Sequence, residues 1–187
     1  LLFRGALYRN RGCVVTLEHG CYAHINCLRP ESRGTVRLAS ADPAAAPLID
    51  QNCLAEPQDR RIMRRGVQIA REIFAQRAFD PYRGDEFEPG RATLSDAEID
   101  TFIRSHADAD YHSVGTARMG QDMQAVVDGR LRVRGVEGLR IADASIMPRI
   151  VGANTNMAVI MIAEKAADMI LNRPALPRTE PGLDHAA

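Results

Sequence analysis

Two stretches of the chain carry polar residues in arrangements that packing alone does not explain. In the first, residues 111–120, His112 leads into a loop punctuated by glycine. A histidine suits proton transfer near neutral pH because its unperturbed pKa is about 6.5. The second comprises Asp143–Pro148 and then Asn154-Thr155-Asn156, which open an apolar segment. We expect a helix to start there, and its first N–H groups suit both capping by asparagine and binding of an anionic group.

A cluster near the N-terminus has a spacing that could suggest zinc. It contains Cys21, His24 and Cys27, with His19 just upstream. The segment reads as extended, however, and on a strand residue 24 faces the opposite side from residues 21 and 27. We therefore expect small residues packed in a sheet and no metal site. The four cysteines favour a reducing compartment.

The composition excludes several classes of protein. The chain has 187 residues, of which 45% are hydrophobic, and 24 Lys+Arg balance 24 Asp+Glu. This is enough apolar material for a globular core, and a net charge of zero gives no pull toward nucleic acid or anionic lipid. No apolar run reaches the ~18 residues needed to span a bilayer. A cysteine hydrolase built on Cys13 or Cys53 has no recognisable nucleophile turn behind it.

An antiparallel sheet is predicted in the first fifty residues. The segments Cys13–His19 and Ile25–Leu28 suit strands. A turn at Ser32–Gly34 leads into Thr35–Leu38, which alternates polar and apolar residues, and Leu48–Asp50 can resume a short strand after a proline-containing loop. The alternation indicates a sheet with one face exposed to solvent.

Two amphipathic helices are predicted next. Between Pro57 and Arg77 apolar residues recur at the three-four spacing of a helix. Its arginines are most simply a solvated face, since acidic residues share the helix and no aromatics are interleaved as in a nucleic-acid patch. They are Arg60, Arg61, Arg64, Arg65 and Arg71. Ser95 and Glu98 form a capping box that opens a second helix, ending at about His106.

The last third is predicted to hold short strands and a buried helix. Val126–Gly129 is expected to be the end of a strand and a tight turn, and Leu131–Val133 the return strand. Another turn at Gly135–Gly138 is expected before Leu139–Ala142. The helix from Asn156 to Leu171 is apolar all round its first two turns, so we expect it to be buried on every side. Such enclosure needs more protein than this chain obviously supplies. The tail after Pro174 is expected to be loose.

A series of motifs follows in order along the last part of the chain. They are His112 with Gly115-Thr116 and Arg118-Met119-Gly120, Val127-Asp128, Leu139 to Pro148, Asn154-Thr155-Asn156 and Ile162 to Asp168. With these motifs the chain resembles the glucose-methanol-choline (GMC) family of FAD-dependent oxidoreductases. The stretch from Arg29 to Asp50 is similar to the choline dehydrogenase and aliphatic alcohol dehydrogenase branch. The resemblance runs from about Arg29 to Ile170 and is far more specific than one glycine pattern.

The resemblance implies an α+β fold, in which an antiparallel sheet flanked by helices is joined by a C-terminal strand and buried helix that complete the FAD domain. Residues 1–110 would be part of the substrate-binding domain, and residues 111–173 the histidine loop and the return to the FAD domain. Residues 174–187 would be a loose tail. The glycine-rich turn that holds the ADP half of FAD is missing from the sequence. We therefore expect a C-terminal part of a longer enzyme that binds FAD weakly or not at all alone.

The resemblance also implies roles for individual residues. His112 matches the catalytic histidine, which takes the hydroxyl proton of an alcohol as a hydride leaves for flavin N5. Asn154 matches the second active-site position, where an amide orients the alcohol. Thr155 and Asn156 would approach the pyrimidine edge of the flavin. Asp143 and Ala144 would contact the flavin through their backbone, although Asp143 also reads as a turn residue that ends a strand.

The expected reaction is oxidation of choline or a primary aliphatic alcohol to an aldehyde, with FAD as cofactor. Ser113 departs from the proline frequent after the family's catalytic histidine, which loosens the backbone but leaves the side-chain chemistry intact. The expected partners are a small alcohol and the missing FAD-binding half, without nucleic acid. Association with a membrane or a quinone acceptor stays open, and we expect a cytoplasmic location, with or without peripheral attachment to the inner membrane. The alternative is a non-catalytic module that binds a partner chain.

Overall fold

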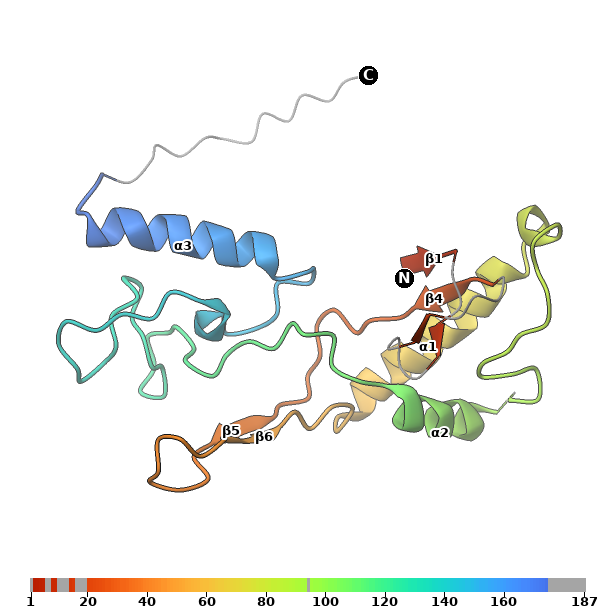
Figure 1. Ribbon diagram of the computed structural model, residues 1–187, viewed down its shortest axis with the longest axis horizontal. Helices are drawn as coiled ribbons and strands as arrows, with labels where there is room; N and C mark the ends of the chain where they lie inside the picture. Colours follow the sequence, from red (N-terminus) through yellow and green to blue (C-terminus); the bar gives the residue numbers. More distant parts are fainter. Residues whose placement is uncertain (1, 6–7, 10–13, 16–19, 94, 175–187) are drawn as a thin grey trace, which may run out of the picture.

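The computed structural model describes residues 2–5, 8–9, 14–15, 20–93 and 95–174 of the chain. The architecture is α+β, as predicted, with short antiparallel strands followed by helices (Figure 1). No helix in this part of the chain is long and apolar enough to cross a membrane. The elements are β1 (Leu2–Arg4), β2 (Tyr8–Arg9), β3 (Val14–Val15), β4 (Tyr22–His24), β5 (Thr35–Arg37), β6 (Leu48–Asp50), α1 (Pro57–Phe74), η1 (Arg77–Phe79), α2 (Asp96–His106), η2 (Ala144–Ile146) and α3 (Asn156–Ile170).

The described strands form three antiparallel pairs, β1–β4, β2–β3 and β5–β6. The β5–β6 hairpin confirms both strands predicted there, with Val36 opposite Ile49. Every residue of the hairpin is exposed, so the expectation of one covered face is wrong at this place. The reason is visible in Figure 1, where the hairpin projects away from the helices. Gly34 permits the pairing, because a Cβ at this position would collide with the carbonyl oxygen of Asp50.

The strand predicted at Ile25–Leu28 is wrong, because β4 ends at His24. In the described residues its ladder with β1 runs from Leu2 opposite His24 to Arg4 opposite Tyr22. Side chains hold the following segment instead of a ladder, beginning with Asn26, whose Nδ2 donates to the carboxylate of Asp110 across 3.1 Å. Of the strand predicted at Cys13–His19, only Val14–Val15 lies within the described residues, where it forms β3.

Helices α1 and α2 confirm the two predicted amphipathic helices and pack against each other. Val67 of α1 meets Ile99 and Ile103 of α2 in one hydrophobic core. The capping box of Ser95 opens α2 as expected, whereas α1 ends at Phe74, a few residues earlier than predicted. A glycine in the middle of α1 lets the helix approach the segment after β4, because a Cβ on Gly66 would collide with Ile25.

The arginines of α1 are not simply a solvated face, and for two of them that expectation is wrong. Arg64 makes a bidentate ion pair with Asp100 of α2, with N···O distances of 2.8 and 2.6 Å. Arg71 pairs with Glu86 in the loop before α2, where its Nε and Nη2 both donate to Oε1, at 3.0 and 2.8 Å. The two arginine side chains are only 24% and 27% exposed. They fasten α1 to α2 and to the intervening loop.

The segment before α3 is a set of hydrogen-bonded loops, not the short strands we predicted. Its extended pieces meet only at isolated bridges, such as Val127 with Val133 and Arg132 with Arg140. The backbone turns too often for a ladder, with φ of 64° at Leu131 and 77° at Gly135. The loops and α3 share a second hydrophobic core, formed by Val127, Leu131, Ile146, Met147, Ile162 and Ala166.

Helix α3 matches the predicted bounds within one residue, but it is not buried on every side. Only Ile162 and Ala166 are buried, where the helix lies over the loops. On the outside, Met157 is 74% exposed and Met161 is 56% exposed. The expectation fails because the described chain covers one side of α3 only (Figure 1). An apolar outer face is therefore left uncovered.

Candidate active site

The side chain of His112 lies against the N-terminus of α3. Its Nδ1 is 2.9 Å from the Oγ1 of Thr155 and 3.5 Å from the backbone nitrogen of the same residue. Thr155 is only 7% exposed, whereas His112 is half-buried. The two residues are 43 positions apart in the chain. Their contact brings together the two polar stretches singled out in the sequence.

The histidine loop is held in place by the segment that carries Asp143 and Ala144. The backbone N–H of Ala117 donates to the carbonyl of Ser145 across 3.0 Å. Gly115 has a φ of 93°, and a Cβ there would lie 3.3 Å from the carbonyl oxygen of Met147. A glycine is therefore needed where the loop passes close to this segment. These two contacts fix the position of the loop of residues 111–120 relative to the segment that precedes α3.

Asn154 and Asn156 flank Thr155, and the side chains of both asparagines are exposed. Thr155 occupies the N-cap position of α3 with helical backbone angles, and its hydroxyl contacts His112 and makes no capping hydrogen bond. The first N–H groups of the helix and two exposed amides thus lie at one end of α3. This set of donors fits a polar, electron-rich edge such as that of a flavin.

Asp143 and Ala144 begin the short η2 turn. The carboxylate of Asp143 accepts a hydrogen bond of 2.7 Å from the backbone N–H of Ser145, so its side chain caps the turn. Ala144 packs against the second hydrophobic core. The interpretation of Asp143 as a turn residue thus accounts for its side chain. Contact between the backbone here and a flavin stays a prediction.

Asp110 was missed by sequence reasoning, although it anchors the start of the histidine loop. It accepts the 3.1 Å hydrogen bond from Asn26, and His24 Nε2 lies 4.0 Å from its other carboxylate oxygen. The contact spans 84 residues, so no local pattern could reveal it. The one available signal was a polar Asn26 within a segment read as a packed strand. Asp110 ties the loop that bears His112 to the end of β4.

Asp59 was also missed, and it organises the loop between β4 and β5. It is 1% exposed and accepts hydrogen bonds from the backbone N–H groups of Glu31 and Ser32, at 2.9 and 2.8 Å, and from the Ser32 hydroxyl. Burial alone would raise the pKa of this carboxyl, but the hydrogen bonds outweigh burial and hold its pKa below the usual value. Asp59 therefore stays ionised in the fold.

The described members of the cysteine cluster, Cys21, His24 and Cys27, do not form a metal site. Cys27 lies with its Sγ 3.9 Å from a carboxylate oxygen of Asp59, and burial raises the pKa of its thiol. His24 is turned toward Asp110. Among the described residues, no group of three His, Cys, Asp or Glu could hold a metal ion. His19 lies outside the described residues.

The described structure gives no support for Cys13 or Cys53 as the nucleophile of a hydrolase. Cys13 lies outside the described residues. Cys53 is a free thiol whose pKa is raised by partial burial of the sulfur and then by nearby carboxylates, Asp108 and Asp50 among them. An activated thiol nucleophile needs the opposite shift.

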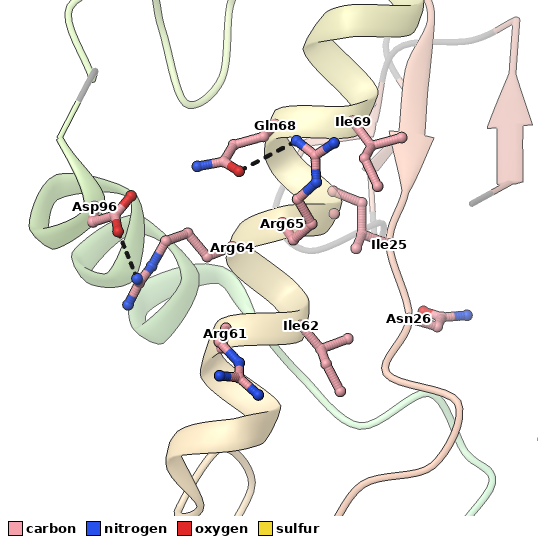
Figure 2. Close-up of a pocket in the computed structure, with 10 residues that line it drawn as sticks. Ile25, Asn26, Arg61, Ile62, Arg64, Arg65, Gln68, Ile69 and Asp96 are labelled. Carbon is pink, nitrogen blue, oxygen red and sulfur yellow. Dashed lines mark hydrogen bonds and ion pairs between the residues drawn. The ribbon is translucent and has the colours of Figure 1, made fainter.

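A cleft of about 680 Å³ lies along α1 and not beside His112. Figure 2 shows isoleucines and arginines on its walls, with Arg64 turned to Asp96 and Arg65 to Gln68. Arg65 also pairs with Glu72 across 2.8 Å. Carboxylates of the same chain thus neutralise Arg64 and Arg65, whereas Arg61, which also lines the cleft, donates to the neutral side chain of Gln58.

Comparisons with known proteins agree on one family. The sequence model described as "GMC oxidoreductase" matches residues 30–163. An oxygen-dependent choline dehydrogenase of Acinetobacter baumannii is 51% identical over 162 residues, which is 87% of this chain and 29% of that protein. The protein of the same description from Escherichia coli is 48% identical and is matched over 88% of this chain and 30% of its own length. The chain thus spans less than a third of the curated relatives it matches.

Solved structures show the same likeness. Pyridoxine 4-oxidase from Mesorbium loti superposes with a TM-score of 0.74 at 34% identity, covering 79% of this chain and 29% of that chain. A fungal aryl-alcohol oxidase gives a TM-score of 0.72 at 35% identity, with coverage of 78% and 24%. Formate oxidase gives 0.73 at 36% identity, with coverage of 78% and 26%.

Proposed function

This chain belongs to the GMC oxidoreductase family, whose members depend on FAD, and from that premise we propose a specific reaction for it. We propose that it is the C-terminal portion of an enzyme that oxidises a CH–OH group to an aldehyde. The substrate would be choline or a primary aliphatic alcohol. The identity of 51% with a choline dehydrogenase supports this substrate class.

The observation that carries the proposal is the placement of His112 at the uncapped end of α3, directly beside the residue that follows Asn154. In the proposed reaction His112 takes the hydroxyl proton of the alcohol. The exposed amide of Asn154 hydrogen-bonds the same oxygen and orients the carbon that loses the hydride. His112 is half-buried, so its ring can meet both the protein and a substrate.

FAD, when bound, supplies the acceptor of the hydride. We propose that the N-terminal turn of α3, with Thr155 and Asn156, lies at the pyrimidine edge of the flavin. There the N–H groups and the positive end of the helix dipole would stabilise negative charge. Asp143 and Ala144 would contribute backbone contacts. Because the Thr155 hydroxyl already bonds His112, its contact with the flavin would come from the backbone.

A second candidate is a non-catalytic module that binds a partner chain. The uncovered apolar side chains on the outside of α3 favour a covering partner in either case. In the enzyme that partner would be the FAD-binding half, in the same chain or supplied by another. In the module it would serve binding alone. We also propose a cytoplasmic location, consistent with the free thiols of Cys21, Cys27 and Cys53.

The test is reduction of the flavin in the holoenzyme, followed anaerobically in a stopped-flow spectrometer with choline and with primary alcohols. We expect His112→Ala to lower the rate of flavin reduction by about a hundredfold or more, because a general base is lost. Asn154→Ala should lower it by about tenfold, since one orienting hydrogen bond is removed. A loss below about threefold for His112→Ala would exclude its assigned role.

His106→Ala provides a matched control, because His106 is exposed and bonds within α2 through Nδ1, 2.9 Å from the carbonyl of Phe102. This variant should reduce flavin at the wild-type rate. If the FAD-loaded protein shows no reduction with any alcohol tested, the non-catalytic module becomes the better interpretation.

A further inference from the structure

The backbone turns sharply just before His112. Tyr111 has a φ of 59°, in the left-handed region that bulky residues rarely adopt. The residue is 95% exposed, so packing of its ring against the described chain does not hold this conformation. A residue stays in such a region only where the surrounding contacts impose it. In the described structure these contacts come from the residues on either side.

Both neighbours of Tyr111 are held by partners far away in the sequence. On one side the carboxylate of Asp110 accepts the hydrogen bond of 3.1 Å from Nδ2 of Asn26, which follows β4. On the other side Nδ1 of His112 lies 2.9 Å from Oγ1 of Thr155 at the start of α3. Tyr111 thus lies between two fixed points, and its left-handed backbone carries the chain from one to the other.

Resting on the proposed function, we propose that Asn26 and Asp110 are positioning residues for His112. Their hydrogen bond holds the chain two positions before the base and so keeps the histidine ring at the end of α3 that also carries Asn154. Neither of the two touches the alcohol or moves a proton. The inference is carried by the bond of Asn26 to Asp110, across 84 positions, beside the left-handed backbone of Tyr111.

Asn26 lies in a segment that is fixed to α1. The preceding residue, Ile25, packs against the core between α1 and α2, and a Cβ on Gly66 would collide with its side chain. The following residue, Cys27, has its Sγ 3.9 Å from the buried carboxylate of Asp59, also in α1. Because both neighbours are held in this way, the amide of Asn26 is a firm anchor for the histidine loop.

The same segment also reaches the loop of the second site residue. The guanidinium of Arg29 lies beside Gly152, where an added Cβ would be 3.0 Å from its Nε. Gly152 comes two positions before Asn154. Asp110 has the same spacing from His112. The segment after β4 therefore supports both loops, and a common support fixes the distance between two groups that must meet one alcohol oxygen.

A second group near Asp110 is His24, whose Nε2 is 4.0 Å from the other carboxylate oxygen. That separation is too long for a hydrogen bond, whereas the bond from Asn26 has an ordinary length. Asn26 is therefore the partner on which the proposal depends. An uncharged acceptor at position 110 should serve as well as a carboxylate.

The experiment measures KM and kcat, expressed per bound FAD, of the holoenzyme with choline and with a primary alcohol. Asp110→Ala removes the acceptor, so the ring of His112 should leave its position and kcat should fall by about tenfold. KM should stay nearly unchanged, because Asp110 does not touch the substrate. Asp110→Asn keeps an oxygen that can accept the bond from Asn26, and its kcat should stay within about twofold of the wild-type value.

A swap of the two side chains tests the pair itself. Asn26→Asp leaves two carboxylates facing each other without a donor, and kcat should fall by about tenfold. Addition of Asp110→Asn supplies the donor from the other side, so kcat should return to within about threefold of the wild type. Two residues that act separately through packing would give no such rescue.

Asp85→Ala is the matched control for loss of a carboxylate. The side chain of Asp85 is 93% exposed and pairs with Arg91 in the loop before α2, so kcat should stay at its wild-type value.

The position of His112 is read without turnover, from crystal structures of the holoenzyme and of its Asp110→Ala variant. We expect the variant to lose the contact between His112 and Thr155 and to return Tyr111 to a negative φ. The wild type should keep both features.

Each of three results would overturn the proposal. The first is a kcat of Asp110→Ala within about twofold of the wild type. The second is a swapped pair no more active than Asn26→Asp. The third is an Asp110→Ala structure in which His112 still contacts Thr155. The proposed function fails separately, if no alcohol reduces the flavin of the wild type. The crystal structures need no turnover, so the two failures are distinguishable.

Discussion

The ring of His112 contacts a residue far away in the sequence. Its partner is Thr155, 43 positions later. The residue types alone predict that a histidine, an amide and the end of a helix form this site. The pairing of the ring with a threonine hydroxyl is not predicted, because the same threonine reads equally well as an ordinary helix cap.

Asp59 is a buried charged residue outside the site, and its substitution should lower stability. Asp59→Asn removes the charge that three hydrogen-bond donors from Glu31 and Ser32 surround in a buried position. We expect a loss of about 2 kcal/mol in the free energy of unfolding, measured by urea denaturation at pH 7. Asp42→Asn is the control, because Asp42 is exposed and accepts only the N–H of Ala44 there; it should change stability by less than about 0.5 kcal/mol.

The loss of unfolding free energy in Asp59→Asn should depend on pH. The pKa of Asp59 is lowered from 3.8 in the fold, so its ionised form contributes stability above about pH 4. That contribution is lost as the pH falls through the lower pKa of the folded state. The gap in unfolding free energy between the wild type and Asp59→Asn should therefore narrow below about pH 4. A gap that stays constant down to pH 2 would contradict the lowered pKa.

At the scale of elements, helix α1 shows how a propensity argument can mislead. A glycine inside a helix is about 1 kcal/mol less favourable than alanine, so Gly66→Ala should stabilise an isolated helix. Here a Cβ on Gly66 would collide with Ile25, which is branched at Cβ and cannot easily move aside. We expect Gly66→Ala to destabilise the protein by about 1–3 kcal/mol in urea denaturation.

A double-mutant cycle checks that explanation. In an Ile25→Ala background the collision is removed, so Gly66→Ala should become neutral or stabilising, with a coupling energy above about 1 kcal/mol. Gly84→Ala is the control, since nothing lies within 4 Å of a Cβ at that position. Additive effects of Ile25→Ala and Gly66→Ala would refute the close approach between α1 and the segment after β4.

At the scale of the molecule, the described residues form two hydrophobic cores that are linked by contacts between residues far apart in the chain. One core lies between α1 and α2, and the other lies between α3 and its loops. The hydrogen bond from Asn26 to Asp110 and the approach of Arg29 to Gly152 link the two parts. The outer face of α3 is left with large apolar side chains in contact with water, which a stable assembly would cover.

The covering of α3 can be tested in the holoenzyme. Met161, 56% exposed in this chain, should be buried against the FAD-binding half, so Met161→Asp would place a charge in an apolar contact. We expect the FAD content per protein, measured by absorbance, to fall below about half of the wild-type value. Lys165→Glu, an exposed charge change on the same helix, should retain FAD. A normal FAD content in Met161→Asp would show that this face stays uncovered.

Local signals in the sequence were enough to predict the helices and the residue types of the site. The three-four spacing of α1, the capping box of α2 and the apolar run of α3 each act within a few residues, so their physics is complete in the chain itself. The motifs around His112 and Asn154 likewise identified the family, which the comparisons confirm. The strands of the β5–β6 hairpin were predicted in the same way, from the alternation over Thr35–Leu38 and the strand-forming residues of Leu48–Asp50.

What only the tertiary structure decided depends on contacts between residues far apart in the chain. Ile25–Leu28 has strand-forming residues, yet β4 ends at His24 and Asn26 bonds to Asp110. The segments before α3 turn too tightly for anything but isolated bridges. Arg64 and Arg71 lie at helix positions that the sequence pattern assigns to the solvent-exposed face. In the structure they are largely buried because they pair with Asp100 and Glu86. The contact of Thr155 with His112 is of the same kind. A hydrogen bond or an ion pair depends on the positions of two partners in space, and periodicity along one segment carries no information about a partner dozens of residues away.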